Sequence, residues 1–354
     1  MGENAALISF LLASVGSGLA LWVCFRRLRV HRKKTILRLV LGNLLVFVFL
    51  CVLGLLAGEI YFRFIYDTTD SFGLTKTTQR WFARNFKYND VGLRDSEEYF
   101  NELPPGGRRI AFLGDSFTAG HGVGSVADRF ANRVRAMMPD VEVHVLARPG
   151  MDTGAEVDFL LGVTNSGYEL DVVVLVYCLN DISDIVPEWQ AILKRIYERP
   201  DPGFWVQNSY VCNWLYFRWF AAHDPDVASY YAFVRDNYDG PVWDQQAQRL
   251  ASFRSEITSR GGQLMVVTFP FLHNLGPKYD YQPVHEKLEA FWNRQNVPHL
   301  DLLRTFESLN SSDVVVNSYD AHPNEYAHAL AAHAIADFLQ EQGLQSDRTP
   351  RRDH

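Results

Sequence analysis

The sequence contains little cysteine, has no excess of positive charge and lacks the common cofactor-binding motifs. Four of its 354 residues are cysteines, and the two in the soluble part, Cys178 and Cys212, have no spacing signature, so a disulfide between them remains an open alternative. The net charge of −7 gives no support for nucleic-acid binding. The chain has neither a phosphate-loop lysine motif nor a His-Glu-x-x-His motif, and the glycine-rich run 120–124 lacks dinucleotide-binding spacing. We therefore expect no cofactor and no metal.

Two long apolar segments lie near the N-terminus, and a basic block separates them. Residues 5–25 carry no charge, and residues 36–58 carry only Arg38, so each can span a hydrocarbon core of about 30 Å. Seven cations and no acid lie between Arg26 and Arg38, which places this short loop in the cytoplasm by the positive-inside tendency. The prediction is a multi-pass membrane protein with two spans, in which everything after residue 59 is extracytoplasmic. A cleavable signal peptide and a buried helical hairpin are the alternatives.

Apolar runs and helical spacing alternate from residue 110 onward. The β-branched run at 172–176 suits a strand that is buried on both faces, as in a parallel sheet. Such alternation predicts an α/β fold of three layers (α/β/α), with a doubly wound, flavodoxin-like and mainly parallel sheet. The predicted strands lie at 110–113, 141–146, 171–177, 263–269 and 297–302, and the predicted helices at 127–138, 155–164, 243–259, 284–294 and 325–340.

An aromatic stretch at about 184–239 interrupts this alternation and has no regular pattern. We expect it to form part of the wall of the substrate cleft. Exposed tryptophans there would suit sugar rings, and buried ones would form the core of a subdomain. The predicted organisation is two transmembrane helices with their basic loop (1–59), a lead-in segment (60–109), the catalytic domain with its insertion (110–345) and a disordered tail (346–354).

Residues that can carry chemistry follow the predicted strands, where the ligand sites of such sheets lie. Ser116 follows the first strand, Gly150 the second and Asn180 the third, while Asp320 and His322 precede the last helix. Taken one at a time, these residues are typical of a turn or of a surface histidine. Their order at successive strand ends favours a shared site.

Together these residues offer the parts of an acyl-transfer site. A serine hydroxyl needs a base to take its proton, and His322, with Asp320 to orient its ring, is the candidate base for Ser116. The backbone amides of Ser116 and Gly150 and the side chain of Asn180 are candidate donors to an oxyanion. Two histidines of the last helix, His328 and His333, are expected to pack or to face solvent.

On these residues the sequence resembles the SGNH/GDSL hydrolase family over roughly residues 110–340. The blocks that carry the resemblance are Phe112-Leu113-Gly114-Asp115-Ser116-Phe117-Thr118, Gly150, Asn180-Asp181 and Asp320-Ala321-His322-Pro323-Asn324. The resemblance implies that Ser116 is the nucleophile, that His322 is the base, and that Ser116, Gly150 and Asn180 form the oxyanion hole. The segment 89–95 also resembles one found before the first block in extracytoplasmic members, and we interpret it as a structural lead-in.

Two positions depart from the family pattern. The acid Asp320 lies two residues before His322 instead of three, and Cys178 replaces the glycine of the third block. Cys178 is not expected to be a nucleophile, because it ends a buried strand.

Three functions remain open at this point. The leading one is a serine esterase that acts on an acylated carbohydrate or lipid outside the cytoplasm. The second is an O-acyltransferase that moves the acyl group to a polysaccharide hydroxyl. The third is an inactive binding or assembly protein of the cell envelope, where polysaccharide assembly proteins would be its partners.

Overall fold

The computed structural model describes residues 4–30, 36–103 and 105–344, and the chain forms two compact units. The first unit contains the N-terminal residues up to Thr68 together with Phe72–Trp81 and Arg199–Ala228. The second contains Thr69–Ser71, Phe82–Glu198 and the chain from Ser229 onward. The predicted disordered tail and part of the predicted basic loop, residues 31–35, lie outside the described residues.

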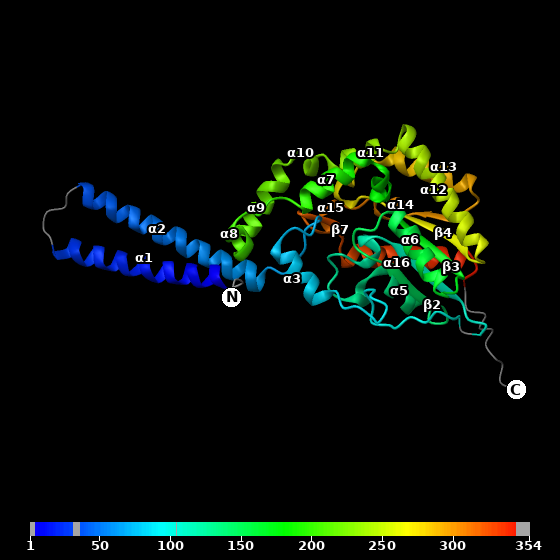
Figure 1. The fold of residues 1–354 in the computed structure, drawn as a ribbon, viewed down its shortest axis with the longest axis horizontal. Helices are drawn as coiled ribbons and strands as arrows, with labels where there is room; N and C mark the ends of the chain where they lie inside the picture. Colours follow the sequence, from blue (N-terminus) through cyan, green and yellow to red (C-terminus); the bar gives the residue numbers. More distant parts are fainter. Residues whose placement is uncertain (1–3, 31–35, 104, 345–354) are drawn as a thin grey trace. The chain divides into compact units, whose positions relative to one another are not determined.

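The second unit is built on a five-stranded parallel sheet with the strand order β2-β1-β3-β4-β5 (Figure 1). This order is that of a doubly wound, flavodoxin-like sheet, whose switch point lies beside β1. The predicted α/β fold is therefore confirmed. The strands are β1 (Arg109–Gly114), β2 (Glu142–Ala147), β3 (Val172–Cys178), β4 (Gln263–Phe269) and β5 (His299–Asp301).

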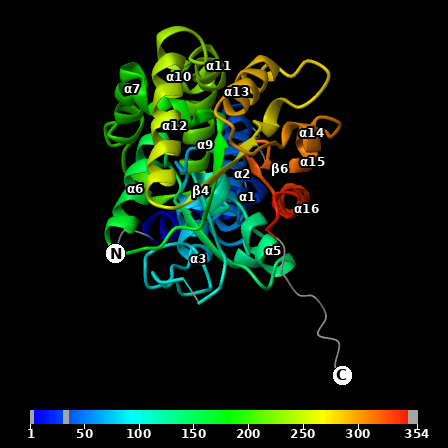
Figure 2. The same cartoon turned by 90° about the vertical axis from the view of Figure 1, so that its right-hand side faces the viewer.

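Helices cover both faces of this sheet. In Figure 2, α6 (Thr153–Asn165) and α12 (Gly240–Ser259) lie on one side of β4, and α5 (Phe130–Met137) and α16 (Glu325–Glu341) lie on the other. Each helix buries one apolar stripe, as Phe130 and Val134 do in α5. The remaining helices of the sheet layers are α4 (Ser116–Ala119), α13 (Gln282–Arg294), α14 (Leu303–Phe306) and α15 (Ser311–Val314).

Two features of local structure were not predicted. Asp320 and His322 precede the last helix, as expected, but they lie in a short strand, β7 (Asp320–Pro323), which pairs antiparallel with β6 (Val315–Asn317). The insertion is helical rather than irregular. It contains α7 (Pro187–Tyr197), α8 (Phe204–Asn208), α9 (Tyr210–His223), α10 (Pro225–Ala228) and α11 (Tyr230–Asp236).

The first unit contains two long apolar helices, α1 (Ala5–Val30) and α2 (Ile36–Ile60), which lie side by side in Figure 1. The candidate spans Ala5–Arg27 and Ile36–Ile65 have mean hydropathies of 2.0 and 2.8. In the apolar 18-residue window of each segment only 6% and 11% of the residues are buried, unlike the core helix of a soluble protein. Their length and exposed apolar surface suggest a membrane anchor. Helices α8, α9 and α10 of the insertion belong to this unit, as does most of α3 (Lys76–Asn85).

Candidate active site

A tight turn at the end of β1 lifts Ser116 off the sheet. A side chain at Gly114 would collide with the hydroxyl of Thr118, so the turn requires glycine. Asp115 caps the short helix α4, and its Oδ1 accepts a hydrogen bond of 2.8 Å from the amide of Phe117. Ser116 is therefore the first residue of α4, and its side chain remains partly exposed.

Three of the predicted site residues form a continuous hydrogen-bonded chain. The Nε2 atom of His322 lies 2.8 Å from the Oγ atom of Ser116, and its Nδ1 atom lies 2.6 Å from Oδ1 of Asp320. The backbone amide of His322 donates to the same carboxylate oxygen at 3.1 Å. With Nδ1–H facing the carboxylate, the unprotonated Nε2 faces the hydroxyl, as a general base must.

The second oxygen of Asp320 has partners of its own. Its Oδ2 accepts a hydrogen bond from the hydroxyl of Thr69 and lies 3.3 Å from Nε2 of His121. Burial opposes the ionisation of Asp320, but the neighbouring His322 and His121 hold the pKa of this carboxyl well below its ordinary value. Asp320 therefore contacts His322 despite the unusual two-residue spacing, and Thr69 and His121 hold its carboxylate in this position.

His121 is a site residue that sequence reasoning missed. Its ring lies parallel to that of His322, with centroids 3.9 Å apart and 4° between the planes. Burial, together with His322, lowers the pKa of His121, which favours the neutral ring. Its neighbours Gly120 and Gly122 have φ angles of 77° and 86°, which favour glycine. The signal that could have found His121 is this Gly-His-Gly pattern, which lacks dinucleotide-binding spacing but places the histidine in a turn.

Asn180 and Ser116 both contact the carboxylate of Asp115. The Nδ2 atom of Asn180 lies 3.3 Å from Oδ2 of Asp115, and Oγ of Ser116 lies 3.4 Å from that same oxygen. Burial raises the pKa of Asp115, although its hydrogen bonds oppose this shift. The side-chain amide of Asn180 therefore lies near the Ser116 hydroxyl, because both contact the same carboxylate oxygen. Its role as an oxyanion donor stays a prediction.

The turn after β3 is held by Asp181, not by Asn180. The Oδ2 atom of Asp181 accepts a hydrogen bond of 2.8 Å from the amide of Cys178. Cys178 is fully buried, and burial raises the pKa of its thiol well above the ordinary value, which makes it a poor nucleophile. All four cysteines of the chain are free thiols.

Gly150 lies in an exposed turn after β2, three residues beyond Ala147, which pairs with Gly114 of β1. Its φ of 82° favours glycine, and an added Cβ would meet no atom within 4 Å. The turn is closed by a hydrogen bond of 3.3 Å from the amide of Met151 to the carbonyl of Arg148. Gly150 and Ser116 thus follow the ends of two neighbouring strands, β2 and β1. The role of the Gly150 amide as an oxyanion donor stays a prediction.

The sequence profile of the GDSL-like lipase/acylhydrolase family matches residues 112–330. The chain belongs to this family. It is therefore an SGNH-type hydrolase, and the general chemistry of the family is the hydrolysis of acyl esters. No curated protein sequence matches the chain.

Several solved structures of GDSL-type proteins are similar to this hydrolase. A lipolytic protein from Veillonella parvula is 15% identical, with a TM-score of 0.38 over 65% of this chain and 97% of that one. The psychrotrophic esterase EstA from Pseudoalteromonas sp. is 13% identical, with a TM-score of 0.41 over 66% and 98% of the two chains. A two-domain esterase active on acetylated mannans is 17% identical, with a TM-score of 0.38 over 66% and 49%.

The lead-in segment of this GDSL-type hydrolase contacts the loop that carries His121. Arg94 is buried, and its two terminal nitrogens donate hydrogen bonds to four carbonyls around the His121 loop. The acceptors are the carbonyls of Ala119 (3.1 Å), Gly120 (2.6 Å), Val123 (2.6 Å) and Gly124 (3.2 Å). The predicted structural segment therefore positions the loop that carries His121.

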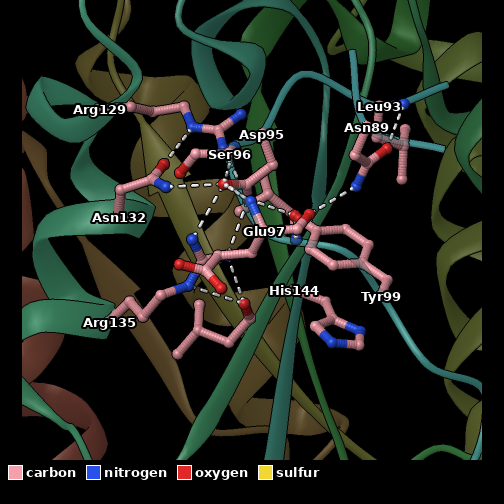
Figure 3. Close-up of polar contacts among 12 residues, drawn as sticks. Asn89, Leu93, Asp95, Ser96, Glu97, Tyr99, Arg129, Asn132, Arg135 and His144 are labelled. Carbon is pink, nitrogen blue, oxygen red and sulfur yellow. Dashed lines mark hydrogen bonds and ion pairs between the residues drawn. The ribbon is translucent and has the colours of Figure 1, made fainter. Parts of the chain in front are cut away.

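The next residue, Asp95, makes many of the polar contacts drawn in Figure 3. It accepts hydrogen bonds from Arg129, Arg135, Asn132 and Tyr99. Burial opposes its ionisation, but hydrogen bonding by Arg135 and the charge of Arg129 hold the pKa of Asp95 well below its ordinary value. A charged, fully paired carboxylate thus joins the lead-in segment to α5.

Among the described residues, one group has the donor atoms to hold a metal ion: His121, Asp320 and His322, whose atoms lie within 4.8 Å of one another. The same nitrogens and oxygens are already engaged with one another and, through His322, with Ser116. The geometry therefore fits proton transfer better than metal binding.

Proposed function

We propose that the chain hydrolyses an ester, an acetyl or other acyl group on an extracytoplasmic carbohydrate or lipid, through an acyl-enzyme on Ser116. One observation carries this proposal. His322 contacts the Ser116 hydroxyl at 2.8 Å through one ring nitrogen and Asp320 at 2.6 Å through the other. These two contacts orient the ring of His322 for proton transfer from Ser116, which an inactive binding protein does not require.

The reaction follows from these contacts. His322 takes the proton of the Ser116 hydroxyl while Oγ attacks the ester carbonyl, so that a C–O bond forms and the carbonyl oxygen becomes an anion. The amides of Ser116 and Gly150 and the side chain of Asn180 are the proposed donors to this oxyanion. The intermediate collapses, the alcohol leaves with the proton from His322, and water repeats the sequence to release the acid.

Asp320 and His121 are proposed to support His322. Asp320 holds the ring with Nδ1–H toward the carboxylate and stabilises the imidazolium that forms during each transfer. His121 and Thr69 hold the other oxygen of Asp320, which stops the carboxylate from rotating away. His121 is thus a positioning residue that acts through Asp320.

An assay of products tests the function. The purified full-length protein should release acid and alcohol from a nitrophenyl acyl ester, and Ser116→Ala should abolish this activity. Addition of an acceptor sugar separates hydrolysis from transfer, since a transferase would form the acylated sugar at the expense of free acid. Absence of both products, in a protein that melts normally, would support the inactive binding protein.

We also propose that α1 and α2 span the membrane and that the catalytic unit is extracytoplasmic. The proposal is supported by the two exposed apolar helices and by the cations between Arg26 and Arg38. A reporter enzyme that works only outside the cytoplasm should be active when fused after the C-terminus and inactive when fused at Lys33. The opposite pattern would overturn this topology.

A further inference from the structure

Part of the insertion packs on the apolar hairpin, within the first unit. The side chains of Ala6, Phe10, Leu56 and Val211 form one small buried core, so α1, α2 and α9 meet there. A side chain at Gly58 of α2 would meet Val211 at 2.9 Å. The helices are therefore in close contact, and residues 204–211 cannot be treated as a free surface loop.

A buried carboxylate fixes this contact. Glu59 is fully buried at the end of α2 and pairs with Arg63 at 2.6 Å. It also accepts hydrogen bonds from the hydroxyl of Ser209 at 2.7 Å and from the amide of Val211 at 3.1 Å. Arg63 donates to the carbonyl of Asn208 at 3.1 Å. Asn208, Ser209 and Val211 all lie where α8 ends or α9 begins, so the ion pair anchors the connection between these helices to the hairpin.

The same network gives the depth of α8 along the hairpin. Arg63 lies within 3.4 Å of the side chain of Asn4, one residue before α1 begins. Trp205 of α8 stacks on Phe10 of α1, with ring centroids 5.3 Å apart. Phe10 is six residues beyond Asn4, which is about 9 Å along a helix axis. If α1 spans the bilayer, Trp205 lies about 9 Å deeper in the membrane than the ion pair of Glu59 and Arg63. Interfacial helices bury their apolar face to a similar depth of about 5–10 Å.

The outer side of α8 is apolar and uncovered. Phe204 is 51% exposed and Trp205 is 47% exposed, although Trp205 already stacks on the hairpin. Tyr61 and Phe64, which flank Arg63 in η1 (Tyr61–Ile65), are 45% and 61% exposed. Trp and Tyr side chains gather where a protein crosses from lipid to water, because their rings are apolar and their N–H or O–H groups can remain hydrated, while Phe204 and Phe64 are wholly apolar.

We propose that α8 dips into the outer leaflet of the bilayer, with Phe204 and Trp205 among the lipid chains. The lipid is favoured as the occupant because this surface is continuous with the lipid-facing sides of α1 and α2, at the depth just derived. A sugar would need hydrogen-bonding groups beside the stacked ring, and the neighbour of Trp205 is the apolar Phe10. The proposal rests on the membrane anchor proposed above, and it makes the insertion a third contact with the bilayer.

Site-directed spin labelling tests this proposal. The four native cysteines are replaced by alanine, and one nitroxide is attached at a time to Phe204→Cys, Leu12→Cys or Ala222→Cys. Leu12 is an exposed residue of α1 and serves as the lipid control, while Ala222 is exposed at the polar end of α9 and serves as the water control. Full-length protein is placed in vesicles of zwitterionic phospholipid with a minority of anionic phospholipid. Accessibility to oxygen, which concentrates in lipid, is compared with accessibility to a water-soluble nickel chelate.

The expected oxygen-to-nickel ratio at position 204 is close to that at position 12 and several-fold above that at position 222. A high nickel accessibility at position 204, with position 12 still in lipid, would place α8 in water and overturn the proposal while leaving the anchor intact. Shielding of position 204 from both reagents would mean that protein covers it, which also overturns the proposal. If position 12 itself proves accessible to nickel, the anchor fails and the proposal fails with it.

Discussion

His121 lies flat against His322, 3.9 Å away, and touches the same carboxylate, Asp320, from the opposite oxygen. Two rings therefore contact one carboxylate at different oxygens: His322 is hydrogen-bonded to Oδ1, and His121 lies 3.3 Å from Oδ2. The order of contacts runs from Ser116 through His322 and Asp320 to His121. The lowered pKa of His121 favours its neutral form. A neutral His121 places no second positive charge beside His322.

The first prediction concerns His121. His121→Phe keeps a flat ring against His322 but removes the contact with Asp320, so kcat should fall about tenfold, which corresponds to roughly 1.4 kcal/mol, with KM little changed. His121→Gln offers an amide N–H to the carboxylate and should recover part of the loss. The kinetics of both variants are measured beside their thermal midpoints. A loss of stability without a change in kcat would make His121 a packing residue.

The second prediction concerns Asn180. An oxyanion donor acts only when negative charge develops, so Asn180→Ala should lose about 10²–10³ in kcat with little change in KM. The alternative role, capping of the turn after β3, already belongs to Asp181. The thermal midpoint should therefore stay near that of the parent. A destabilised variant with near-normal turnover would remove Asn180 from the site.

The third prediction concerns the Arg94 clamp. Arg94→Ala leaves four carbonyls without their buried donor, so the free energy of unfolding should fall by more than about 3 kcal/mol. Arg108→Ala is the matched control, because Arg108 is 47% exposed and its ion pair with Asp171 should contribute less than about 1 kcal/mol. Denaturant unfolding of both variants decides the matter. Equal losses would show that Arg94 contributes only as a surface residue does.

The fourth prediction concerns a buried acid, Glu156 of α6. Its side chain is fully buried, and neither carboxyl oxygen has a hydrogen-bond partner among the described residues. Burial, with the nearby charges of Asp115 and Asp152, raises the pKa of Glu156 well above its ordinary value. As the pH rises past about 4.5, the unfolded chain ionises at this position while the folded one keeps its proton, so the folded state loses stability.

Glu156→Gln removes this titration. The thermal midpoint of the variant should fall less than that of the parent between pH 5 and pH 8, whereas the exposed Glu97→Gln should follow the parent. Thermal melts over this range compare the three proteins. A parent and a Glu156→Gln variant with parallel pH profiles would show that Glu156 does not titrate in this way.

Much of the sheet could be predicted from sequence, because buried parallel strands are continuous apolar runs. The run that became β3 was such a case, and it placed Asn180 at the correct edge. The β6–β7 hairpin could not be predicted, since the two strands are only three and four residues long and β7, which carries His322, has no apolar pattern. The roles of Thr69 and Arg94 depend on contacts with residues 251 and 25–30 positions away, which no local pattern reports.

The insertion shows a further limit of sequence reasoning. We expected the insertion to form part of the wall of the substrate cleft, which stays a prediction, with its tryptophans either exposed or in the core of a subdomain. Trp205 stacks on Phe10, almost two hundred residues earlier, and Trp189 is buried against Tyr230 and Phe233. An aromatic composition predicts that these side chains pack against other residues, but it does not identify those residues. By contrast, the expected roles of the two histidines on α16 are confirmed. His328 is buried and accepts a hydrogen bond from the amide of Phe130, and His333 is exposed.

The central claim is that Ser116 is a nucleophile activated by His322, and covalent labelling tests it most directly. A fluorophosphonate reacts with an activated serine and leaves a phosphonyl group on its oxygen as fluoride departs. Mass spectrometry of the full-length protein should show one added group, on the peptide that contains Ser116, and labelling should be absent in Ser116→Ala and strongly slowed in His322→Ala. No labelling of the folded parent protein, or equal labelling of the Ser116→Ala variant, would contradict the account.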